Sequence, residues 1–257
     1  MDRSLISAVL ALALLVTPRA VPARAHSAAA DHDSAFVPVV IFHHIKWLTP
    51  ADDAMERGLT VLPSQFQAEL AYLARAHYHT IGAAQLVRYL RLGGSLPPKP
   101  VVLTFDDGYR DVYPNAYRLL RQQHMTATFF IVPGFLNTPR YLTWTQVEDM
   151  SAHGMDIESH TMTHPDLTTL SPSRRWYELT ESRRELESRL HRSIRVFAYP
   201  YGAFAGLTGE VAKAGYWGAF TTQAGWWQRR SDLLTLPRVY SHLTDTVASF
   251  AALLRGD

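Results

Sequence analysis

Residues 101–108 read VVLTFDDG, an apolar run that ends at two successive carboxylates and a glycine. The apolar run predicts a strand buried on both faces, as in a parallel sheet covered by helices. Gly108 permits a sharp turn directly after that strand. Asp106 and Asp107 would repel each other if both were buried without partners, so the pair indicates a cation beside one of them. The alternative is that the two aspartates only form an N-cap or a turn that opens the following helix.

Predicted strands and helices alternate on both sides of this run. The strands are expected at residues 37–42, 101–105, 127–132, 155–159 and 195–199. The helices are expected from Ser64, as N-cap, to residue 74 and at 83–92, 113–123, 144–153, 172–190 and 206–214. Strands that alternate with helices imply a parallel sheet, either open or closed into a barrel. A length of 257 residues suits one α/β domain of this kind.

Polar side chains follow several of the predicted strands at the point where each strand ends. His43 and His44 follow the first strand, the two aspartates follow the second, and the segment Tyr199-Pro200-Tyr201-Gly202 follows the last. In α/β folds the carboxyl ends of parallel strands face one crevice, where reactive groups collect. We therefore expect these side chains to share a site.

Two histidines four residues apart, His160 and His164, complete a candidate set of metal ligands. Pro165 disfavours a helical backbone at His164, so the pair is expected on a loop. Two histidines at this spacing are more often surface residues that bind no metal. Together with the aspartate pair, however, they favour a metal site. One carboxylate and two imidazoles leave coordination positions open, as in hydrolytic sites, and the second Asp can then act as base. Zinc fits such ligands best, with cobalt, nickel, iron and manganese left open.

The same residues carry a family resemblance. The segments 104–108 (TFDDG) and 160–165 (HTMTHP) resemble the first two motifs of the polysaccharide deacetylases, the NodB-homology group or carbohydrate esterase family 4. The segments 127–130 (ATFF) and 197–202 (FAYPYG) also resemble that family, so the likeness spans about residues 101–238. The segment 42–45 (FHHI) further resembles the subgroup that deacetylates poly-N-acetylglucosamine, which extends the match towards Phe36.

This resemblance implies the fold and the roles of the site residues. The implied fold is a distorted (β/α)7 barrel of the NodB-homology type, formed as a single catalytic domain over residues 36–257. The implied roles are general base for Asp106, metal ligand for Asp107, His160 and His164, and oxyanion donor for the backbone N–H of Tyr201. The implied cofactor is a divalent metal, with Zn²⁺ favoured over Co²⁺, Ni²⁺ or Fe²⁺.

The sequence departs from the usual family pattern at two places. Ala198 stands where the third motif usually carries the arginine that orients the base, and Arg238 is a candidate substitute unless it is only a surface arginine. The fifth motif, Leu-x-His, is not matched cleanly, although His242 lies near its place. In the poly-N-acetylglucosamine subgroup a histidine like His43 fills the acid role, so we favour His43 over His242 as general acid.

Composition and the first residues predict where the protein works. Residues 1–25 read as a signal peptide, because Arg3 precedes a short apolar stretch and Ala23-Arg24-Ala25 offers a cleavage site. Residues 26–35 are expected to form a flexible lead-in, and the absence of cysteine excludes disulfides. A formal charge of +2 does not indicate a nucleic-acid partner, and the charges of residues 174–192 predict a solvated helix face. We expect a secreted, periplasmic or extracellular monomer without a lasting membrane span.

Together these features predict metal-dependent removal of N-acetyl groups from a polysaccharide that contains N-acetylglucosamine. Poly-N-acetylglucosamine is the first candidate, followed by peptidoglycan and chitin oligomers. Two alternatives remain open at this point. One is a non-catalytic glycan-binding protein on the same fold, and the other is a hydrolase of small amides or acetyl esters. Trp144, Trp226 and Trp227 are candidate sugar-stacking side chains, although such residues more often only pack in cores or grooves.

Overall fold

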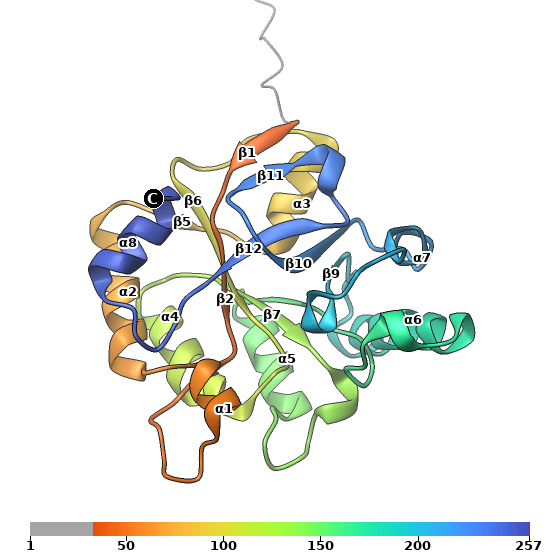
Figure 1. Ribbon diagram of the computed structural model, residues 1–257, viewed down its shortest axis with the longest axis horizontal. Helices are drawn as coiled ribbons and strands as arrows, with labels where there is room; N and C mark the ends of the chain where they lie inside the picture. Colours follow the sequence, from red (N-terminus) through yellow and green to blue (C-terminus); the bar gives the residue numbers. More distant parts are fainter. Residues whose placement is uncertain (1–32) are drawn as a thin grey trace, which may run out of the picture.

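A computed structural model describes residues 33–257, and the predicted signal peptide lies outside this range. Seven parallel strands form a closed ring in the order β2, β12, β10, β9, β8, β7 and β6, because β6 also pairs with β2 (Figure 1). The predicted single-domain (β/α)7 barrel is therefore confirmed. Its strands are β2 (Val39–Phe42), β6 (Pro100–Phe105), β7 (Thr128–Ile131), β8 (Asp156–Ser159), β9 (Val196–Ala198), β10 (Gly218–Ala224) and β12 (Leu236–Tyr240).

Helices surround this barrel and connect most of its strands (Figure 1). They are α1 (Ala54–Gly58), α2 (Pro63–Arg75), α3 (Ala83–Leu92), α4 (Arg118–Gln122), α5 (Trp144–Ala152), α6 (Pro172–Leu190), α7 (Thr208–Lys213) and α8 (Val247–Arg255). The predicted bounds of α3 and α6 are confirmed. The N-cap predicted at Ser64 is wrong, because Leu62 caps α2 and Pro63 takes the first helical position, which suits the fixed φ of proline. Over the described residues no helix is both long and apolar enough to cross a membrane.

The last two barrel strands, β10 and β12, were not predicted from the pattern of residues. No α-helix separates them; the chain passes instead through the short strand β11 (Trp227–Arg229), which pairs with β1 (Ser34–Phe36). Pro237 lies within β12, and the register between β10 and β12 shifts beside it. Proline is rare in central strands except at such irregularities, so the sequence gives only a weak strand signal there.

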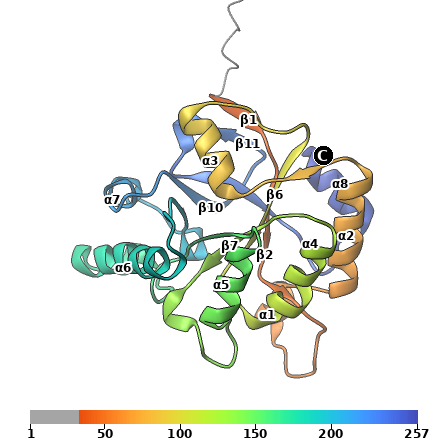
Figure 2. The same cartoon turned by 180° about the vertical axis from the view of Figure 1, so that it is seen from behind.

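One end of the barrel is closed by a helix and the other is left open. Helix α3 packs its apolar side chains, Leu86 and Val87 among them, against barrel residues such as Val102, Phe130 and Phe220. Figure 2 shows α3 beside β1 and β11 at the closed end, with α1 at the opposite end. The strands run in parallel from the closed end, so their carboxyl ends surround the open one. This is the end where the predicted site residues lie.

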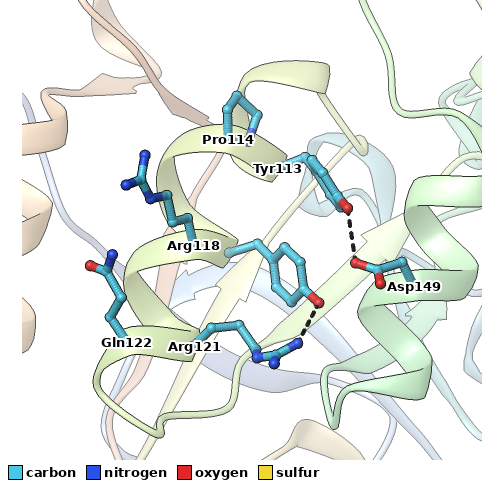
Figure 3. Close-up of a pocket in the computed structure, with 7 residues that line it drawn as sticks. Tyr113, Pro114, Arg118, Arg121, Gln122 and Asp149 are labelled. Carbon is cyan, nitrogen blue, oxygen red and sulfur yellow. Dashed lines mark hydrogen bonds between the residues drawn. The ribbon is translucent and has the colours of Figure 1, made fainter.

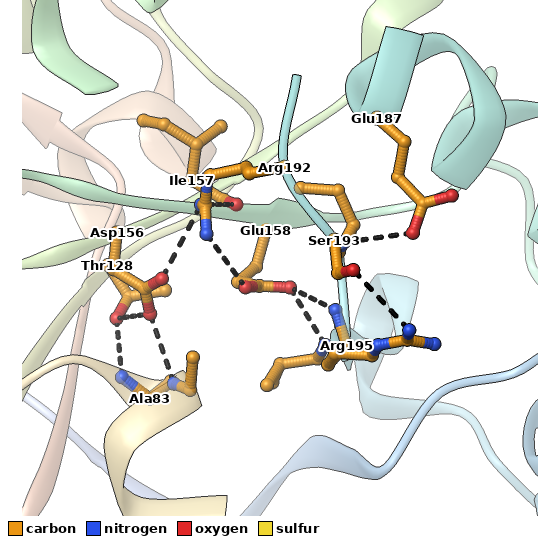
Figure 4. Close-up of polar contacts among 12 residues, drawn as sticks. Ala83, Thr128, Asp156, Ile157, Glu158, Glu187, Arg192, Ser193 and Arg195 are labelled. Carbon is orange, nitrogen blue, oxygen red and sulfur yellow. Dashed lines mark hydrogen bonds and ion pairs between the residues drawn. The ribbon is translucent and has the colours of Figure 1, made fainter. Parts of the chain in front are cut away.

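Buried polar contacts fix β8 beneath the open end (Figure 4). The fully buried Glu158 accepts hydrogen bonds from the backbone N–H of Arg195 and of Val196. Burial and the nearby Asp156 raise the pKa of Glu158 well above its usual value. Asp156 in turn accepts hydrogen bonds from the backbone N–H of Ala84 and from the Thr128 hydroxyl. These contacts join β8 to β7, to β9 and to the start of α3, and so hold the strand that ends at the site.

Candidate metal centre

Asp107, His160 and His164 converge at the open end of the barrel. Each offers one ligand atom, and these atoms lie within 4.8 Å of one another. The Nε2 atoms of His160 and His164 lie 3.3 and 3.1 Å from Oδ1 of Asp107, yet this buried oxygen has no hydrogen-bond partner. A buried carboxylate oxygen without a donor, facing two imidazole nitrogens, is the environment that a bound cation satisfies. The three residues therefore fit a divalent metal with open coordination positions.

The loop that carries the two histidines is held by a residue from α6. Glu178 is fully buried and accepts hydrogen bonds from the backbone N–H groups of Met162 and Thr163 and from the Thr163 hydroxyl. The prediction that residues 174–192 form a solvated helix face is thus wrong at Glu178, which points inward. The sequence offers a partial signal, because Glu178 is one turn from Ser182 and two turns from Leu186, which are buried on the same face of the helix.

A carbonyl group fixes the orientation of His160. The Nδ1 atom of His160 lies 2.7 Å from the backbone oxygen of Ala198, and a carbonyl can only accept. Nδ1 therefore carries the proton, and the Nε2 lone pair faces Asp107. His164 has a positive φ of 61°, and its backbone N–H donates to the Thr161 hydroxyl. Both imidazoles are thus positioned by contacts outside the ligand set.

Arg238 pairs with Asp106 inside the barrel. Its Nη1 and Nη2 atoms each lie 2.8 Å from one carboxylate oxygen of Asp106, a two-pronged contact. Arg238 is fully buried, and it also donates to the backbone oxygen of Thr221 and to the Thr104 hydroxyl. The alternative of a surface arginine is therefore wrong. Ala198, at the position of the usual motif arginine, is buried among the side chains that fill the barrel interior.

The carboxyl of Asp106 is held in its ionised form. Burial by itself raises its pKa, but the charge and the hydrogen bonds of Arg238 oppose burial, and the pKa lies below the usual value. An ionised carboxylate without a proton of its own is the form that can accept one.

The structure separates the two candidate acids, His43 and His242. His43 lines the same pocket as the three ligands and Asp106, whereas the exposed His242 lines the adjoining pocket. Tyr240 stands between them, with its ring centroid 6.3 Å from that of His43 and 5.7 Å from that of His242. Burial lowers the pKa of His43, although the nearby Asp106 and Asp107 partly oppose that shift.

His44, the other histidine at that strand end, has a different environment. Its Nδ1 atom lies 2.7 Å from the carboxylate of Asp111, and its ring stacks on Tyr109 at 3.7 Å between centroids. Tyr109 lines the ligand pocket, so His44 and Asp111 support one wall. Sequence reasoning missed this support, because Asp111 is one of many polar residues after the aspartate pair.

Tyrosines rather than tryptophans dominate the walls of the pocket. Tyr201 is 68% exposed, and its ring centroid lies 4.9 Å from that of His164 in an edge-to-face arrangement. Its φ of 59° is rare outside glycine, and the turn requires Gly202, since a Cβ there would lie 2.1 Å from the Thr222 hydroxyl. The side chains that line the pocket are His43, Met55, Leu59, Asp106, Asp107, Tyr109, Phe135, Tyr141, His160, His164, Tyr199, Tyr201, Thr222 and Tyr240.

A second hollow lies on the outside of the barrel, between α4 and α5 (Figure 3). Two contacts pair polar groups within it, since the Tyr113 hydroxyl donates to Asp149 and Arg121 donates to the Tyr117 hydroxyl. None of its lining residues lines the ligand pocket. We therefore place no chemistry there.

Comparison with known proteins agrees with this geometry. The model of the polysaccharide deacetylase family matches residues 93–217. The Bacillus subtilis (strain 168) protein YxkH, which is named for the same family, is 30% identical over 80% of this chain and 71% of its own length. The poly-β-1,6-N-acetyl-D-glucosamine N-deacetylase of Escherichia coli (strain K12) is 26% identical over 82% of this chain, which spans only 38% of that relative. The deacetylase PplD of Streptococcus pyogenes, solved with acetate, superposes with a TM-score of 0.79 at 27% identity, over 85% of this chain and 97% of PplD.

Proposed function

This chain belongs to the polysaccharide deacetylase family and is an N-deacetylase, and from that premise we propose that it removes N-acetyl groups from an N-acetylglucosamine polysaccharide. Poly-β-1,6-N-acetylglucosamine is the first candidate, because relatives from several bacteria carry that substrate in their names. One observation supports the proposal most: the unpartnered oxygen of Asp107 and two imidazoles lie beside the paired Asp106 and Arg238. We further propose that the protein works outside the cytoplasm as a monomer.

The proposed reaction assigns one task to each group in the pocket. A divalent cation held by Asp107, His160 and His164, zinc first, would polarise the acetamide carbonyl and acidify water. Asp106, oriented by Arg238, accepts a proton from the water that attacks the acetyl carbon. The backbone N–H of Tyr201 donates to the oxyanion that develops on the carbonyl oxygen.

His43 is the proposed acid for the second half of the reaction. The bond between the acetyl carbon and the sugar nitrogen breaks, and the leaving amine takes a proton from His43. Acetate and a free amine on the sugar are the products. The choice of His43 is supported by its position in the lining of the ligand pocket beside Tyr240, whereas His242 does not line that pocket.

The His43→Ala variant is expected to lower kcat on an acetylated oligosaccharide by about 10²- to 10³-fold, the usual contribution of a positioned acid. An aryl acetate has a leaving group that needs no proton, so the same variant should lose much less activity on that ester. The matched control is His242→Ala, for which kcat on the oligosaccharide should change by less than about threefold because its ring is outside the ligand pocket. A large loss of kcat with His242→Ala alone would reverse the assignment.

The proposed function is tested by incubating zinc-loaded protein with β-1,6- and β-1,4-linked N-acetylglucosamine oligomers. Mass spectrometry should detect loss of acetyl groups and favour the β-1,6 linkage. Chelation should abolish the reaction, and added zinc should restore it. Binding without any release of acetate would favour the non-catalytic alternative. Release only from small amides or esters would favour the other one.

A further inference from the structure

Another pocket, separate from the hollow between α4 and α5, adjoins the pocket that holds the metal ligands. It lies along β10, β12 and the length of α8, and it shares Thr222 and Tyr240 with the ligand pocket. A polymer bound with one acetyl group at Asp107 must place its neighbouring sugars along the surface next to that pocket. The adjoining pocket is therefore a candidate for the next sugar of the chain.

Two aromatic rings line the adjoining pocket and are fixed in place. The Trp226 indole N–H donates to the backbone oxygen of Leu253 at 2.6 Å. The Tyr240 ring is stacked between the rings of His43 and His242. Because the two histidine rings cover the faces of Tyr240, the indole of Trp226 is the ring that can pack on a sugar. A rigid aromatic face suits the apolar face of a pyranose ring, because it buries area at little cost in conformational entropy.

The charge of this pocket is negative. The carboxylate of Asp245 is held by the backbone N–H of His242 at 2.7 Å and by the Ser249 hydroxyl at 3.2 Å. No ion pair joins Asp245 to a cationic side chain among residues 33–257. The guanidinium of Arg238 also borders this pocket, but Asp106, Thr104 and Thr221 already occupy its donors.

We propose that this adjoining pocket binds the neighbouring sugar and that Asp245 favours a free amine on it. The inference rests on the proposed function. An N-acetyl group is neutral, whereas the amine left after its removal takes up a proton and becomes an ammonium. Asp245 attracts that ammonium and gains nothing from an acetamide. The enzyme therefore acts faster beside a sugar that has already lost its acetyl group, and free amines accumulate in runs along the polymer.

The experiment compares two β-1,6-linked oligomers of equal length, one fully acetylated and one with a single free amine. The unaltered protein is expected to show a kcat/KM about threefold to fivefold higher on the second oligomer, the size of one partly exposed ion pair. Tandem mass spectrometry should place the new amine next to the first. The Asp245→Asn variant should bring the ratio of the two kcat/KM values close to one.

The matched control is Asp257→Asn, which removes a carboxylate that borders the same pocket but is paired with Arg255 at 2.6 Å. This variant should keep the preference. A measurement without any variant covers the case that Asp245→Asn fails to fold: raising the salt concentration should reduce the preference of the unaltered protein. Equal rates on both oligomers, or a preference that survives both Asp245→Asn and high salt, would overturn the inference. Absence of turnover on both oligomers would instead overturn the proposed function.

Discussion

Replacing Arg238 with methionine is expected to give the largest combined loss of stability and activity in this protein. The substitution leaves the buried carboxylate of Asp106 without either of its two guanidinium contacts. Breaking a buried pair in this way costs about 3–5 kcal/mol, because an uncompensated charge remains in the interior. The free energy of unfolding, measured by denaturant titration, should fall by that amount, and kcat should fall by about 10²-fold or more as the base loses its orientation.

Two further variants separate charge from catalysis at this pair. Arg238→Met combined with Asp106→Asn removes both charges, so it should recover most of the stability and none of the activity. Arg238→Met combined with Ala198→Arg returns a guanidinium to the barrel interior from β9, and it should recover part of both. The proposal for Arg238 fails if the single variant keeps its stability and turns over substrate at the normal rate.

Asp107→Ala is expected to abolish metal binding and to lower kcat/KM by about 10³-fold or more, since the reaction depends on charge stabilisation by the cation. Bound zinc can be measured by elemental analysis after dialysis. The matched control is Asp106→Asn, which changes the neighbouring carboxylate but leaves Asp107, His160 and His164 in place. That control should keep one zinc ion per chain while losing turnover. Full metal content in Asp107→Ala would contradict the assigned ligand set.

Local patterns predicted most of the barrel, and they failed where the pattern itself is weak. The apolar runs that became β6, β7 and β9 are strong signals, because strands buried on both faces need apolar side chains throughout. By contrast, β10 ends in polar residues and β12 contains Pro237, so neither resembles a buried strand. Closure of the ring was therefore expected only from the family resemblance.

The candidate site shows the same division between local and distant contacts. The spacing of His160 and His164 is local, and the structure brings both histidines to Asp107 as predicted. The partner of Asp106 comes from a strand more than a hundred positions away along the chain. Sequence alone therefore could not decide whether Arg238 orients Asp106 or lies at the surface. Glu178 was misread because charge on a long helix usually faces water, and only the packing of α6 against the histidine loop reveals its role.

The chain enters the barrel at the end that α3 closes, while the pocket opens at the other end (Figures 1 and 2). An affinity tag or a covalent linker placed ahead of Ser34 would therefore sit on the side of the molecule away from the pocket mouth. A protein fixed to a bead or a sensor chip in this orientation would keep its pocket facing the solution. Attachment ahead of Ser34 thus suits assays in which the immobilised protein acts on an insoluble polymer film. Attachment through α8 would crowd the pocket that adjoins the metal ligands, because α8 lines that pocket.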